Sequence, residues 1–61
     1  MTKKELRAKR KSIRSALDTV DLILWQVRRR EDKTDEQIAF LEASVRYLTE
    51  SLAQVNLRLK S

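Results

Sequence analysis

Hydrophobic residues recur at intervals of three and four along most of the chain. In the second half this spacing is unbroken, and the residues that carry it are Ile38, Leu41, Val45, Leu48, Leu52, Val55 and Leu59. In the first half they are Leu6, Ile13, Leu17, Val20, Leu24 and Val27, with Arg10 at the one position of the series that is not apolar. Alternating threes and fours place side chains on one face of an α-helix. The pattern therefore predicts two amphipathic helices, over about residues 3–30 and 35–60.

Both expected helices start with the signature of a capping box. Thr2 is followed three residues later by Glu5, and Thr34 is followed by Gln37. In such a box the threonine hydroxyl accepts a hydrogen bond from the backbone three residues on, while the Glu or Gln side chain reaches back. The second box directly follows a charged segment, so we expect residues 31–34 to link the helices.

Chain reversal at this link predicts an antiparallel helical hairpin, with residues 1–61 forming a single domain. Leu6 then faces Leu59, and Ile13 faces Leu52. The link has no glycine, the residue that most often ends a helix with a positive φ. We therefore expect Asp32 or Lys33 to adopt unusual backbone angles.

One continuous helix in a parallel coiled coil is the alternative fold. The heptad phase runs through the link without a break, with Glu31 and Thr34 at core positions. Polar residues in successive core layers weaken such a continuous stripe, which favours the hairpin.

Each hydrophobic stripe is wider than two paired helices need. Ala16 and Ile23 extend the stripe of the first helix, and Phe40 and Tyr47 lie beside the stripe of the second. A wide apolar face is typical of a bundle in which each helix contacts two neighbours. We therefore predict that two hairpins associate as a homodimer, forming a four-helix bundle, with closure by another protein's helices as the alternative.

Large side chains outside the stripes are candidates for partner binding. Leu22 and Trp25 lie further round the first helix, on an otherwise polar face. Aromatic residues often dominate interface energetics. The candidates for partner contact are Leu22, Trp25, Phe40 and Tyr47.

Composition limits the chemistry. The chain of 61 residues has no Gly, Pro, Cys or His. Without Cys it forms no disulfide, and without Cys or His a structural zinc site is not expected. The serines have no base to activate them as nucleophiles. We therefore expect no enzymatic activity, no catalytic residues, no cofactor and no metal.

Positive charge is concentrated in the first half. Residues 1–31 contain ten Lys and Arg against four Asp and Glu, whereas residues 32–61 contain four against five. A stripe of cations at helical spacing can follow a phosphate backbone. The residues of this basic stripe are Lys3, Arg7, Arg10 and Arg14. The three consecutive arginines Arg28, Arg29 and Arg30 are expected mainly to oppose the negative end of the first helix.

The longest apolar run, Leu22 to Trp25, is far too short to span a membrane. The absence of Cys fits a cytosolic protein, so we expect a cytoplasmic location. The resulting hypothesis is a non-enzymatic protein–protein interaction module, such as a small regulator, adaptor or assembly chaperone, that acts through the helix faces of a self-associating hairpin. A nucleic-acid-binding homodimer that uses the basic stripe is the first alternative. A structural coiled-coil segment of a larger assembly is the second.

Overall fold

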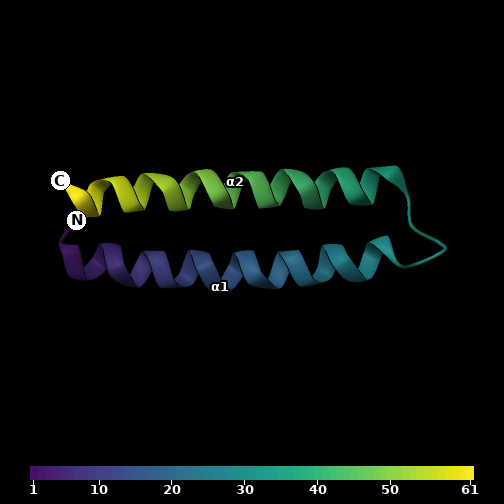
Figure 1. Cartoon of the computed structure of the whole chain (residues 1–61), viewed down its shortest axis with the longest axis horizontal. Coiled ribbons are helices and arrows are strands. Elements are labelled where there is room, and N and C mark those ends of the chain that lie inside the picture. The colour runs from purple at the N-terminus through teal and green to yellow at the C-terminus, as the bar shows by residue number, and fades with distance from the viewer.

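The computed structural model describes all of residues 1–61 and contains two helices. Helix α1 spans Lys3–Arg28 and helix α2 spans Asp35–Lys60. They run antiparallel and side by side, so that both chain termini lie at one end of the hairpin (Figure 1). The molecule measures 45 × 14 × 13 Å. The predicted all-α hairpin is confirmed, and the alternative of one continuous helix is wrong.

The two helix starts differ in how completely they are capped. At α2 both bonds of the capping box are present: Gln37 N–H donates to the Thr34 hydroxyl at 3.1 Å, and Thr34 N–H donates to the Gln37 side chain at 3.2 Å. At α1 the backbone N–H of Glu5 donates to the Thr2 hydroxyl at 3.2 Å. The Glu5 carboxylate accepts from that same hydroxyl and not from the Thr2 backbone. The first box is therefore only half formed.

Replacing Thr34 with Ala is expected to destabilise the protein by about 1 kcal/mol, because the substitution leaves the N–H of Gln37 without its partner. The Thr2→Ala variant is the matched comparison and should cost less, since its cap lacks the reciprocal bond. Urea unfolding followed by circular dichroism measures both. A larger loss in Thr2→Ala than in Thr34→Ala would contradict this ranking.

The link reverses the chain without any unusual backbone conformation. No residue has a positive φ, so the expectation that Asp32 or Lys33 would need unusual angles is wrong. Instead the last turn of α1 tightens, and Arg29 and Arg30 donate backbone hydrogen bonds to carbonyls three residues earlier. The Lys33 ammonium donates to the carbonyl oxygen of Arg28 at 2.7 Å. These bonds satisfy helix-end carbonyls that a C-terminal glycine motif otherwise covers, and they explain why α1 ends two residues before the expected position.

A single hairpin buries very little. Only four of the 61 residues are buried, namely Leu6, Ile13, Leu24 and Val55. Three of them, Leu6, Ile13 and Val55, form one cluster near the chain termini, against which Leu48, Leu52 and Leu59 pack. The remaining stripe residues between the helices, among them Leu17, Val20, Val27, Ile38, Leu41 and Val45, are half-buried. Two helices alone therefore cannot enclose the apolar residues of this chain.

Candidate interaction faces

Antiparallel pairing sorts the residues that flank the core onto two opposite sides of the hairpin. On one side Arg28 of α1 forms a salt bridge with Glu42 of α2, with a nitrogen–oxygen distance of 2.9 Å. On the other side, side chains of both helices, including Lys9 of α1 and Tyr47 and Ser51 of α2, line a shallow groove. The salt bridge and the groove thus mark the two sides of the hairpin.

Residues seven apart on a helix project in nearly the same direction. Ala16 and Ile23 follow Lys9 by seven and fourteen residues, so both lie on the groove side of α1. By the same spacing, residues 40 and 44 share the groove side of α2 with Tyr47 and Ser51. We call this surface the aromatic face, and its residues are Ala16, Ile23, Phe40, Ser44, Tyr47 and Ser51.

The aromatic face exposes large apolar side chains beside small ones. Phe40 is 72% exposed, Tyr47 is 70% exposed and Ile23 is 40% exposed. The Ser44 hydroxyl donates to the carbonyl oxygen of Phe40 at 3.0 Å, within its own helix. A hydroxyl that is already hydrogen-bonded can lose its water at low cost. The aromatic face can therefore lose its bound water at low cost when it packs against another apolar surface.

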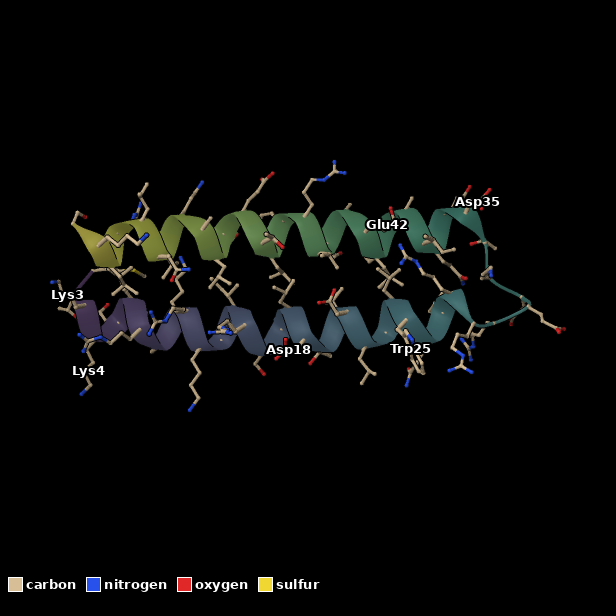
Figure 2. All side chains as sticks on the ribbon, viewed as in Figure 1. Lys3, Lys4, Asp18, Trp25, Asp35 and Glu42 are labelled. Atoms are coloured by element: carbon tan, nitrogen blue, oxygen red, sulfur yellow. The ribbon has the colours of Figure 1, made fainter.

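The four partner-contact candidates fall into two separate places. Phe40 and Tyr47 lie on the aromatic face, whereas Leu22 and Trp25 lie on the outer surface of α1, more than half exposed. Figure 2 shows Trp25 toward the loop end of the hairpin. The guanidinium of Arg29 lies 4.6 Å from the centre of the Trp25 ring, a cation–π distance. The exposed Trp25 ring therefore has a guanidinium group over one of its faces.

Two exposed apolar residues, Met1 and Leu57, were not identified from the sequence pattern; Met1 is 72% exposed and precedes α1. Leu57 is 70% exposed on α2 and lies outside the three–four alternation. The signal for Leu57 in the sequence was a large apolar residue between two polar ones, Asn56 and Arg58, outside the stripe of α2. With Arg58 and Lys60, Leu57 borders a shallow depression near the chain terminus.

The arginines near the link have specific contacts within the hairpin. Arg28 bridges to α2 through Glu42, and Arg29 stacks on Trp25. From the sequence, we expected these arginines mainly to oppose the negative C-terminal end of α1. That expectation did not include the salt bridge of Arg28 or the cation–π contact of Arg29. Arg28 links the two helices through an exposed salt bridge on the side opposite the aromatic face.

The basic stripe lies on the opposite side from the aromatic face. Arg10 and Arg14 of α1 line a second shallow groove together with Asn56 of α2. Arg10 is half-buried, and the other stripe residues are exposed. None of the stripe residues takes part in a salt bridge.

The acidic side chains are dispersed, and no group of three or more of them is placed to hold a metal ion. Neither helix combines the length and apolar character needed to cross a membrane. Comparison of the chain with protein-family models, with curated proteins and with solved structures finds no match.

Proposed function

We propose that this protein is a self-associating protein–protein interaction module in which two hairpins pack through their aromatic faces into a four-helix bundle. One observation carries the proposal. The hairpin buries only four residues, while it exposes Ile23, Phe40 and Tyr47 together on one side. Apolar patches of this kind on small proteins usually mark interfaces.

The dimensions of the hairpin support the same arrangement. Its broad side is 45 Å long and 14 Å wide. Stable interfaces bury roughly 800 Å² on each partner, an area comparable to that of one whole side of this molecule. Small side chains at Ala16, Ser44 and Ser51 let helices approach closely, while Phe40 and Tyr47 supply the apolar area. A second copy offers the same self-complementary surface.

Contact with a different protein requires a surface that self-association leaves free. Leu22 and Trp25 lie outside the aromatic face, so they remain exposed in the proposed bundle. An exposed tryptophan with an adjacent arginine combines two residue types that are enriched among interface hot spots. The proposed regulator or adaptor role uses this outer surface of α1 to contact its partner.

Sedimentation velocity from about 1 µM to about 100 µM tests self-association, because mass action makes a dimer concentration-dependent. We expect a compact particle of twice the 7.2 kDa chain mass. The melting temperature should rise with protein concentration for the same reason. A monomer that melts cooperatively at a concentration-independent temperature would contradict the proposal.

A further inference from the structure

Folding divides the hairpin into halves of opposite charge. The end of α2 returns to the start of α1, so that residues 1–14 and 54–61 share one half of the molecule (Figure 1). These residues include nine Lys and Arg but only one Glu and no Asp, whereas residues 15–53 include five Lys and Arg against eight Asp and Glu. Figure 2 shows Lys3 and Lys4 at the terminal end and Asp35 at the loop end.

Most of these cations lie on one side of the terminal half. The basic stripe is flanked on α1 by Lys4 and Lys11, each one residue after a member of the stripe. On α2, Lys60 follows Asn56 by four residues and therefore projects from the same side. We call this the basic surface, and its residues are Lys3, Lys4, Arg7, Arg10, Lys11, Arg14 and Lys60.

None of the cations of the basic surface forms a salt bridge, and the one carboxylate that lines the groove of Arg10 and Arg14, that of Asp18, pairs with neither of them. The only salt bridge joins Arg28 to Glu42 in the other half of the hairpin. On α1, Lys3 and Arg7 are four residues apart, as are Arg10 and Arg14. Like charges at this spacing destabilise a helix. A polyanion that binds here would relieve that repulsion.

We propose that the basic surface binds the phosphate backbone of duplex nucleic acid. The cations of α1 extend over about 17 Å of helix, from the rise of 1.5 Å per residue. A duplex of that length carries about ten phosphates, since it has one charge per 1.7 Å. No aromatic side chain lies along the stretch of the basic surface: Trp25 projects in the same direction as Lys4 and Lys11, but it lies fourteen residues beyond Lys11, in the other half of the hairpin. Contacts to the backbone are therefore favoured over the reading of base sequence.

An anionic membrane fits this surface less well. A helix that lies on a bilayer inserts apolar side chains on one face and keeps its cations at the edges. Along residues 3–14 of α1 the two large apolar side chains, Leu6 and Ile13, are buried against α2, so the helix offers none to insert into a bilayer beside its cations.

This inference is independent of the proposed self-association. The basic surface and the aromatic face flank the apolar stripe of α1 on opposite sides, because Arg14 directly follows the stripe residue Ile13 whereas Ala16 directly precedes the stripe residue Leu17. A dimer formed through the aromatic faces therefore leaves both basic surfaces exposed. Monomer and dimer alike can bind a duplex.

Fluorescence anisotropy with labelled duplexes of mixed sequence, about 20 base pairs long, tests the inference between about 50 mM and 200 mM salt. DNA and RNA duplexes are both used, and binding to either supports the proposal. The variant R7Q/R14Q removes two cations of the basic surface, and R30Q/R46Q is the matched control because it removes two exposed cations elsewhere. Circular dichroism verifies that both variants keep the helicity of the wild type.

We expect the wild type to bind at about 50 mM salt and to lose most of its affinity by about 200 mM. In R7Q/R14Q the slope of log affinity against log salt should fall by about two, with at least a roughly tenfold weaker affinity at 100 mM. The control should stay within about threefold of wild type, because its charges lie outside the contact. Absence of binding at low salt, or an equal loss in both variants, would overturn the inference. Binding to phosphatidylserine vesicles but to neither duplex would also overturn it, in favour of a membrane surface.

Discussion

Replacing Ile13 with Ala is expected to lower the free energy of unfolding by about 3 kcal/mol. Ile13 is only 8% exposed and belongs to the one buried cluster of the hairpin, with Leu6 and Val55. The substitution removes buried methyl groups and leaves a cavity that the remaining side chains fill poorly. Because so few residues are buried, no second cluster compensates, and we expect the variant to be substantially unfolded at elevated temperature.

The matched control for Ile13 is Leu22→Ala, which removes a side chain of equal size from a position that is 55% exposed. Its cost should be below about 1 kcal/mol, since little apolar area leaves the interior. Urea unfolding at one fixed protein concentration compares the two, because the proposed self-association would make stability depend on concentration. Equal losses in both variants would show that the cluster around Ile13 does not hold the hairpin together.

Replacing Phe40 and Tyr47 together with Ser is expected to weaken self-association at least about 1,000-fold. Both side chains are about 70% exposed in the single hairpin, and in the proposed bundle both enter the dimer interface. An aromatic anchor at the centre of an interface commonly contributes about 2 kcal/mol or more, and about 1.4 kcal/mol corresponds to a tenfold change. Sedimentation equilibrium over a dilution series measures the dissociation constant.

The double variant Leu22→Ser and Trp25→Ser is the control for this experiment. It also removes two large, half-exposed apolar side chains, but from the outer surface of α1. Its dissociation constant should stay within about threefold of wild type, because rim and non-interface residues contribute little. If the Leu22 and Trp25 variant dissociates while the Phe40 and Tyr47 variant remains dimeric, the interface lies on the outer surface of α1 and the aromatic face is not the contact.

Local sequence alone was sufficient for the helices and for where they start. The apolar spacing predicted two helices and their antiparallel arrangement, and Thr34 with Gln37 marked the start of α2. These features depend on residues a few positions apart, so the chain encodes them directly. The end of α1 was less well predicted. It depends on a hydrogen bond from Lys33 back to the Arg28 carbonyl, which a glycine-based rule for helix ends does not include.

The interaction faces were only partly predictable. From the sequence, Phe40, Tyr47, Leu22 and Trp25 formed one set of candidates, because helical spacing places residues around one helix but does not relate two helices to each other. For the same reason, the sequence pattern did not show that Lys60 of α2 lies on the same side as the basic stripe of α1.

What the sequence determined by itself was the pair of amphipathic helices, because periodicity and capping are properties of neighbouring residues. Only the tertiary structure decided which sides of α1 and α2 coincide. Antiparallel pairing places Ile23 with Phe40 and Tyr47 on one side, and it places Arg14 with Asn56 on the other. The physical reason is that each surface combines residues far apart in the chain, whose relation is fixed only when the two apolar stripes pack together.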